Sequence, residues 1–268
     1  MRSVTAQEAP HTRCSVKRVK TDSGEILFHM QKEGGEHLLT ARGICRKDGS
    51  MRFSQFKQDS QHCIAELRPG KEKDEFNLWF NRDGLVDGQS QQNICSIAHD
   101  AIRDTPLYSM RVSLPDRETS ERMGIVVSPE HFADRAIRHA AHEKQDLFPH
   151  TVNKPSTLRL RTKVPEWNEE MQSYTLDYNG RARLASAKNF QLELAPATSA
   201  EAAEIQKAYD TVRGESRRDR RRSRRAIALA GVKLQFGKYD DDTFNLDYAH
   251  PLCGIQALAI ALTTSSWT

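Results

Sequence analysis

The segment Pro251-Leu-Cys-Gly-Ile-Gln-Ala-Leu-Ala-Ile-Ala-Leu262 decides the fold, because it contains the longest apolar stretch of the chain. Only Gln256 interrupts the eleven residues from Leu252 to Leu262. Pro251 suits the first turn of a helix, and the residues after it would be apolar on every face of that helix. Eleven residues are too few to cross a bilayer, which needs roughly 20. We therefore expect a helix surrounded by protein.

Short alternating runs elsewhere in the chain predict the strands that surround this helix. Gly, Asn and Asp separate the runs, which is typical of strands in a meander. The runs cover residues 26–30, 37–39, 76–80, 158–161, 174–178, 190–194 and 232–236. Small residues such as Gly254 and Ala257 would let strands approach the helix closely. The sequence thus predicts a mainly β fold, a barrel of strands around a C-terminal helix.

Two segments depart from the strand pattern and are predicted as outer helices. Residues 91–103 place apolar side chains at helical spacing, and residues 131–144 are rich in Ala, Arg, His and Glu. The second segment contains His139-Ala-Ala-His-Glu143, whose order differs from the HExxH pattern of zinc enzymes. We expect exposed histidines there rather than a metal site. Asp240-Asp-Asp242 lacks the alternating spacing of a calcium loop and predicts a hairpin turn.

An arginine-rich segment interrupts the strands at residues 195–230. Thr198 and Glu201 form a capping box before a short helical pattern, and eight arginines follow between Arg213 and Arg225. With Glu215 and Asp219 this run carries a charge of +6, whereas the whole chain carries +4. We interpret residues 195–230 as a surface insertion. Its candidate contacts with anionic surfaces are Arg217, Arg218, Arg220, Arg221, Arg222, Arg224 and Arg225.

Several partners would suit this run, and the sequence leaves them open. Anionic lipid would attract it, and so would the phosphates of RNA or DNA. A nuclear localisation signal and a solvated linker are further interpretations. No aromatic residue is interleaved, which disfavours sequence-specific recognition of single strands.

Two ordered sets of motifs resemble the Tubby family closely, and looser upstream matches such as Leu38-Leu39 and Glu66-Leu67-Arg68 extend the resemblance to roughly residues 13–265. The first set is Lys163-Val-Pro-Glu-Trp-Asn168, Asn179-Gly-Arg181 and Ser186-Ala-Lys-Asn-Phe-Gln191, and the second is Gln235-Phe-Gly-Lys238, Asp242-Thr-Phe244, Asp247-Tyr248 and Pro251-Leu-Cys253. The resemblance implies a closed antiparallel barrel of twelve strands around a central apolar C-terminal helix, with a few outer helices. We expect a flexible N-terminus at residues 1–12 and one barrel domain at residues 13–268, interrupted by the insertion.

The family resemblance also implies a function, the binding of phosphatidylinositol bisphosphate headgroups by a basic pocket on the barrel surface. Carried over by motif, the pocket residues are Arg42 and Arg68, with Arg46 and Lys47 as helpers. Arginine presents a planar fork of donors that suits phosphate oxygens. The alternative is that Arg42 and Arg68 are ordinary solvated side chains of strand faces.

The family's broader role implies a membrane-associated adaptor in protein trafficking, with membrane-protein cargo and with the cilium as one place of action. The expected location is the cytoplasm and its membrane surface, with the nucleus as an alternative. We expect a monomer with no metal and no cofactor. The five cysteines form no CxxC pair and fit reduced thiols of a cytosolic protein, and no catalytic motif stands out. An enzyme is not expected.

Two rival functions remain at this point. One is a nucleic-acid-associated or transcriptional regulator that uses the arginine-rich insertion. The other is a structural barrel that has lost its lipid site, because Gly43-Ile-Cys45 follows Arg42 where family members continue with basic residues.

Overall fold

A computed structural model describes residues 11–43, 49–55, 63–72, 74–81, 91–101, 108–115, 157–163, 165–195 and 231–266. Within these residues the chain forms strands and one C-terminal α-helix, α5, which spans Gly254–Thr263 and ends in a 3₁₀ turn, η1, at Thr264–Ser266. The strands are β1 Thr12–Lys20, β2 Ile26–Lys32, β3 His37–Arg42, β4 Met51–Ser54, β5 Ala65–Pro69, β6 Glu75–Asn81, β7 Gln91–Ala101, β8 Tyr108–Pro115, β9 Thr157–Thr162, β10 Glu166–Asn168, β11 Ser173–Thr175, β12 Phe190–Leu194, β13 Val232–Asp240 and β14 Thr243–Tyr248.

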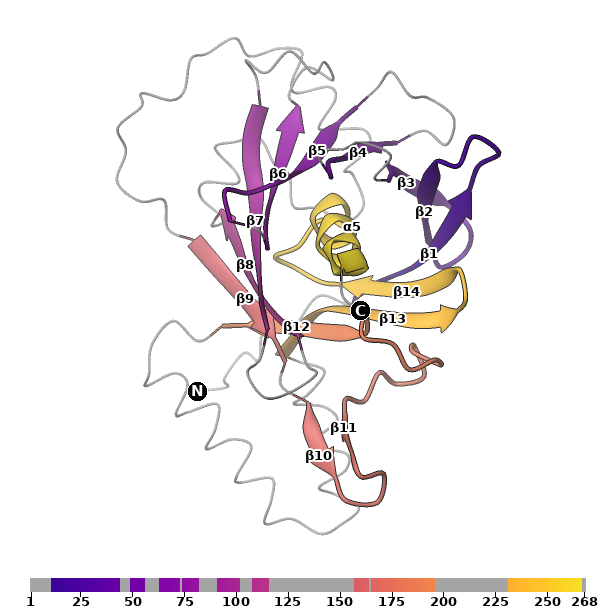
Figure 1. Cartoon of the computed structure of the whole chain (residues 1–268), viewed down its shortest axis with the longest axis vertical. Coiled ribbons are helices and arrows are strands. Elements are labelled where there is room, and N and C mark those ends of the chain that lie inside the picture. The colour runs from indigo at the N-terminus through magenta and orange to yellow at the C-terminus, as the bar shows by residue number, and fades with distance from the viewer. Residues whose placement is uncertain are drawn as a thin grey trace, which may run out of the picture.

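Twelve of these strands close into an antiparallel barrel in the order β1-β14-β13-β12-β9-β8-β7-β6-β5-β4-β3-β2. The barrel closes because β1 pairs with β2 along one edge and with β14 along the other. Strands β10 and β11 form a separate hairpin that projects from the barrel wall (Figure 1). The prediction of a closed twelve-stranded antiparallel barrel is thereby confirmed.

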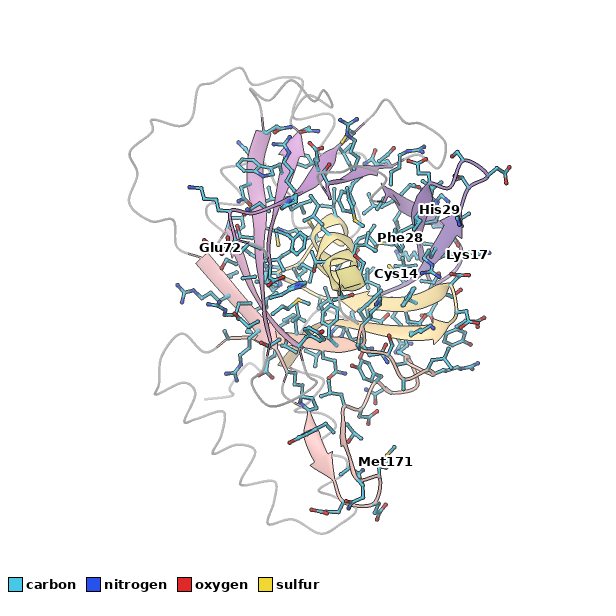
Figure 2. The ribbon with its side chains drawn as sticks, viewed as in Figure 1. Cys14, Lys17, Phe28, His29, Glu72 and Met171 are labelled. Carbon is cyan, nitrogen blue, oxygen red and sulfur yellow. The ribbon has the colours of Figure 1, made fainter. Side chains whose placement is uncertain are left out.

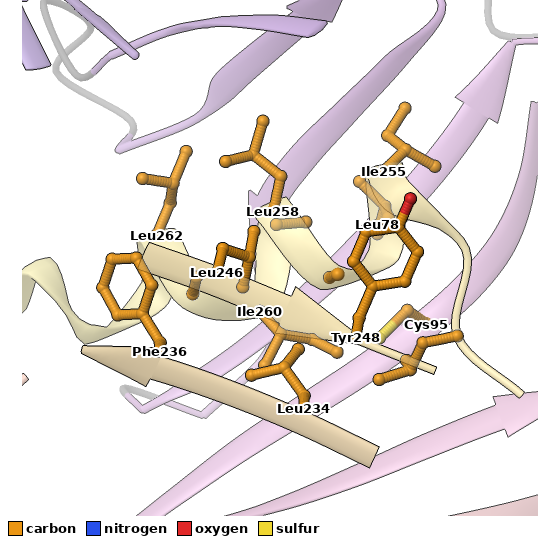
Figure 3. Packing of buried hydrophobic residues seen from close by; sticks show 14 of the residues in the cluster. Leu78, Cys95, Leu234, Phe236, Leu246, Tyr248, Ile255, Leu258, Ile260 and Leu262 are labelled. Atoms are coloured by element: carbon orange, nitrogen blue, oxygen red, sulfur yellow. The ribbon is translucent and has the colours of Figure 1, made fainter. Parts of the chain in front are cut away.

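Helix α5 fills the barrel and supplies the centre of its core (Figure 1). Its residues from Ile255 to Thr263 are all buried, so the helix is enclosed on every side, as its sequence predicts. Figure 3 shows Ile260 of the helix beside Leu234 of β13, and Leu246, Leu258 and Leu262 belong to the same buried cluster. Enclosure of this kind removes apolar surface from water, which is the main favourable contribution to folding.

The helix begins later than the sequence suggests, because Pro251 lies outside it. The His250–Pro251 peptide is cis, and the Leu252 amide donates to the Ala249 carbonyl at 3.0 Å in the turn that follows. Cys253 is the N-cap residue, and its amide donates to the side-chain Oε1 of Gln256 at 3.1 Å. The prediction of proline in the first helical turn is wrong, because this turn separates Pro251 from the helix.

Residues 91–103, predicted as a helix, contain strand β7 instead. A bulge causes the misleading spacing: Cys95 pairs with Leu78 and Asn93 pairs with Trp79, so Ile94 is an extra residue. Ile94, Cys95 and Ile97 are consequently all buried, which imitates helical periodicity within a strand. The carbonyl of Ile94 accepts a hydrogen bond from the Gln256 side chain at 2.8 Å, so the only polar side chain within the apolar stretch fastens the helix to the bulge.

The other predicted strands lie where the alternating runs place them, except in the projecting hairpin. There only residues 173–175 are in a strand, and the side chain of Tyr174 is 49% exposed. Residues 131–144 lie outside the described residues. Among the described residues, no helix has both the length and the apolar character that crossing a bilayer requires.

Arg181, from the Asn179-Gly-Arg motif, fastens the chain after the hairpin to the outside of the barrel. Its Nε and Nη2 donate to the two carboxylate oxygens of Asp247 at 2.8 and 2.5 Å, and Nη2 also donates to the Cys14 carbonyl at 3.1 Å. Asp247 accepts a further bond from the Gln235 side chain at 2.7 Å. The motif therefore has a structural role in this chain.

Candidate anion-binding surface

Strands β3 to β6 alternate between apolar side chains that face the helix and polar side chains that face outward. On β4, Phe53 points into the core and is fully buried, whereas Arg52 points outward. On β5, Leu67 points inward, whereas Glu66 and Arg68 point outward. The strand period thus places charged residues from neighbouring strands on one outer surface.

The strand register brings these charges into one row across the sheet. Arg42 on β3 pairs with Arg52 on β4, and Arg52 pairs with Glu66 on β5. Trp79 on β6 continues the row beside Glu66. Two arginines therefore stand directly opposite each other, an arrangement that is unfavourable unless negative charge lies close by.

Glu66 supplies negative charge at the centre of this row. Its Oε2 accepts bonds from Nε and Nη2 of Arg68 at 3.0 and 2.7 Å. Its Oε1 lies 3.7 Å from Nε of Arg52, which is an ion pair but too long for a hydrogen bond. The Glu66 side chain is only 6% exposed, whereas those of Arg52 and Arg68 are 33% and 37% exposed. The arginines thus face solvent over a buried carboxylate.

Arg42 has a carboxylate partner of its own. Its Nη1 donates to Oε2 of Glu25, in the turn before β2, at 3.2 Å. We call Arg42, Arg52, Arg68, Glu25 and Glu66 the outer cluster. Its three positive and two negative charges leave a net charge of one positive unit.

Trp79 adds an aromatic surface to the edge of the outer cluster. The guanidinium carbon of Arg68 lies 5.9 Å from the centroid of the Trp79 ring, which is within the range of a cation–π contact. Tryptophan is also a residue that favours the boundary between a membrane and water. The surface therefore combines donors for phosphate oxygens with a side chain suited to a bilayer surface.

The structure places both described residues of the predicted pocket, Arg42 and Arg68, on this outer surface. Arg46, Lys47 and the insertion arginines 217–225 lie outside the described residues, so their contributions stay predictions. Sequence reasoning assigned no role in the site to Arg52 or Glu66. The alternation Met51-Arg52-Phe53 identifies an outward arginine, but only the register shows which residues it faces.

The structure describes one of the two segments that the sequence analysis rejected as metal sites. Asp241 and Asp242 form the turn between β13 and β14, where Asp242 pairs with Arg18 at 2.7 Å and Asp241 with Lys238 at 3.4 Å, so the hairpin prediction is confirmed. His139 to Glu143 lie outside the described residues. In the described part of the chain, no group of three or more His, Cys, Asp or Glu side chains is arranged to hold a metal ion.

Comparisons with known proteins match almost the whole chain to one family. A family model described as Tub family matches residues 3–266. The chain is 33% identical to Tubby-like F-box protein 12 of Oryza sativa subsp. japonica over 68% of its length, and 27% identical to Tubby-like F-box protein 2 of Arabidopsis thaliana over 94%. It is 24% identical to Tubby-related protein 3 of Mus musculus over 94%. The chain spans 37%, 67% and 50% of the lengths of these relatives, respectively.

Proposed function

Because the chain belongs to the Tub family, we propose that it is a phosphoinositide-binding module that attaches to the cytoplasmic face of a membrane. Its ligand is the headgroup of a phosphatidylinositol bisphosphate, held by Arg42 and Arg68 with Arg46 and Lys47 as helpers. The observation that carries the proposal is the presence of Arg42, Arg52 and Arg68 on three consecutive strands of one outer surface. Binding of this kind needs no catalytic group.

The chemistry of the outer cluster suits a ligand with several phosphates. An arginine carries five N–H donors, and Arg68 uses two of its nitrogens on Glu66, so part of its guanidinium remains for a ligand. Phosphate oxygens accept bidentate bonds from such groups. Because two hydrogen bonds to Glu66 already orient Arg68, this side chain loses less conformational entropy when a headgroup binds.

The position of Trp79 supports attachment to a bilayer rather than binding of a free sugar phosphate. A headgroup held beside this ring would bring the indole to the level of the lipid headgroups, where tryptophan is favoured. Membrane attachment through such a site agrees with the adaptor role in trafficking that we propose for the module, with a membrane protein as cargo.

One observation favours the rival function, a structural barrel without a lipid site. Arg42 and Arg68 each pair with a carboxylate, and these pairs lower the attraction of the surface for anions. A family barrel that had exchanged its ligand for internal ion pairs would have this arrangement. The two functions differ in one measurable property, the selective binding of bisphosphates.

Liposome flotation across a panel of lipids tests the proposal. We expect flotation with phosphatidylinositol bisphosphates and none with phosphatidylserine at physiological salt. The double variant Arg42→Ala/Arg68→Ala should lose at least about tenfold in affinity, because each charge-assisted bond contributes on the order of 1.5 to 3 kcal/mol. Weak attachment that depends on salt should persist.

The matched control is Arg111→Ala/Arg161→Ala, which removes the same charge from β8 and β9. Arg111 and Arg161 are also register partners on the outside of the barrel, each with its own carboxylate. Selectivity should survive in this control. Full selectivity in the Arg42/Arg68 variant would place the pocket elsewhere, and no binding by the unmodified chain would favour the structural barrel.

A further inference from the structure

We propose that Glu66 is an internal counter-ion that competes with anionic ligands for Arg52 and Arg68 and thereby sets the affinity threshold of the outer cluster. The inference rests on the proposed function for the nature of the ligand, a phosphorylated inositol headgroup. In this role Glu66 orients the two arginines and lowers the affinity of the outer cluster for anions, although it is itself acidic.

The burial of Glu66 is the first observation behind this role. Outward side chains of a barrel normally reach solvent, yet only 6% of this side chain is exposed. A buried carboxylate is unfavourable unless it is paired and hydrogen-bonded. Arg68 and Arg52 are two of its partners, and each faces a different carboxylate oxygen. Glu66 therefore lies between the two guanidinium groups and below their exposed edges.

The geometry of Arg52 is the second observation. Its Nε atom is buried and has no acceptor within hydrogen-bonding distance among the described residues, because Glu66 Oε1 lies 3.7 Å away. Coulombic attraction rather than a hydrogen bond holds this pair. Because this long ion pair is its link to Glu66, the exposed part of the Arg52 guanidinium can engage a phosphate without breaking a hydrogen bond to that carboxylate.

A ligand at this surface meets both charges at once. A phosphate close enough to bind Arg52 and Arg68 is also close to the Glu66 carboxylate, which repels it. The repulsion reduces the net attraction for every anion, so a ligand with one negative charge gains too little to bind. A headgroup with several phosphates forms more hydrogen bonds to the exposed edges of the arginines, and the energy of these bonds can outweigh the repulsion by Glu66. Glu66 thus keeps the site closed to singly charged lipids.

A variant that removes the charge of Glu66 but keeps the shape of its side chain isolates the repulsion. Glu66→Gln retains an oxygen that can accept from Arg68 and removes the negative charge. We expect it to bind bisphosphate vesicles about fivefold to tenfold more tightly, the change that one unit charge produces near a protein surface. It should also acquire measurable binding to phosphatidylserine vesicles, with a steeper dependence on salt.

The matched control is Glu193→Gln, because Glu193 is also a partly buried carboxylate on the outer surface. It pairs with Arg161 at 2.9 Å on β12 and β9, strands that do not neighbour β5. The net charge of the chain changes equally in both variants. An affinity gain in Glu66→Gln alone supports a local role, and an equal gain in both variants overturns it.

Binding is measured with phosphatidylcholine vesicles that contain phosphatidylinositol 4,5-bisphosphate, and separately with soluble inositol 1,4,5-trisphosphate. A gain with both probes assigns the effect to the headgroup. Unchanged or weaker binding by Glu66→Gln overturns the inference, because orientation of the arginines would then outweigh repulsion.

The outcomes separate this inference from the proposed function. If the unmodified chain binds bisphosphates selectively and Arg42→Ala/Arg68→Ala loses that selectivity, but Glu66→Gln shows no gain, only the inference fails. If Glu66→Gln binds although the unmodified chain does not, the inference holds and the proposed function fails. If neither binds, both fail.

If Glu66→Gln does not fold, a measurement on the unmodified chain still tests the inference. The side-chain Nε–H signal of Arg68 is followed by NMR during titration with the trisphosphate, because competition must alter its bond to Glu66. We expect a saturable shift of this signal. A constant signal at high trisphosphate concentration overturns the inference.

Discussion

The two faces of strands β3 to β6 use the same backbone for opposite purposes. The inner face consists of side chains such as Phe53 and Leu78, which are fully buried against helix α5. The outer face carries Arg52 and Glu66, whose charges offset each other near solvent. Adjacent residues of one strand are therefore stabilised in different ways, one by apolar burial and the next by charge pairing near solvent.

The two faces differ in how well they tolerate substitution. The inner face tolerates little change of volume and no unpaired charge, because its side chains are close-packed in a dry core. The outer ion pairs contribute less to stability, because each joins at least one arginine that faces solvent, and pairs near solvent typically contribute about 0 to 1 kcal/mol. Stability should therefore depend on the inner face, and ligand binding on the outer face.

The largest expected effect comes from a charge inside the barrel. Ala257 is fully buried on α5, so Ala257→Asp would place a carboxylate without a counter-charge in the core. A cost on the order of 5 kcal/mol or more matches the total stability of many domains and should unfold the chain. Circular dichroism during heating measures this. Met171→Asp, at the exposed tip of the hairpin in Figure 2, is the control and should melt like the unmodified chain.

Two adjacent residues of β4 test the comparison directly. Phe53→Ala should cost about 3 to 5 kcal/mol because it leaves a cavity beside the helix. Arg52→Ala should cost only about 1 kcal/mol, because Arg68 still donates two hydrogen bonds to the buried Glu66 carboxylate. Denaturant unfolding of both variants gives the two free energies. Similar values would contradict the division between the faces.

A smaller effect is expected from His99, a polar residue of β7 whose Nε2 lies 2.9 Å from the hydroxyl of Thr263 at the end of the helix. Burial lowers the pKa of His99 from 6.5 to about 4, against the opposing effects of Asp74 and Asp100. The fold favours the neutral ring, so this contribution is complete above pH 6.5 and is lost as the pH falls toward 4.

Melting temperatures of the unmodified chain and of His99→Gln between pH 6.5 and pH 4 check this expectation. The variant should lose less stability over the range, since glutamine does not titrate. Parallel curves for the two proteins would show that His99 stays uncharged or is solvated in the folded chain.

The smallest effect is expected from deletion of residues 197–229 with a short Gly/Ser bridge. Glu193 of β12 and Val232 of β13 are register partners, so the two ends of the insertion already lie side by side. The melting temperature should change by no more than about 4 °C, the shift that roughly 1 kcal/mol causes in a domain of this size. Insoluble protein from a well-expressed gene would contradict the interpretation as an insertion.

The sequence predicted the central helix correctly because its evidence is local. A short segment that is apolar on every face must be enclosed, whatever encloses it. The prediction for residues 91–103 was wrong because a bulge at Ile94 produces helical spacing within a strand. Periodicity cannot distinguish the two cases, since the bulge exists only in relation to β6.

The outer cluster was predictable only in part, for a related reason. Arg42 and Arg68 followed from a motif, and the structure places both on the outer surface. Arg52 and Glu66 were assigned no role because their meaning depends on strand register, which joins residues that are distant in the chain. An isolated arginine in an alternating strand gives no indication of the carboxylate that it will face.

The position of α5 in the chain has a consequence for the order of assembly. Every barrel strand leaves the ribosome before the helix, and β1 must wait for β14 before the barrel can close. Until residues 252–262 emerge, the apolar faces of the strands have nothing to enclose. Contacts between segments so distant form slowly and leave apolar surface open to aggregation. The nascent chain should therefore expose apolar strand faces, which chaperones bind, until residues 252–262 have been synthesised.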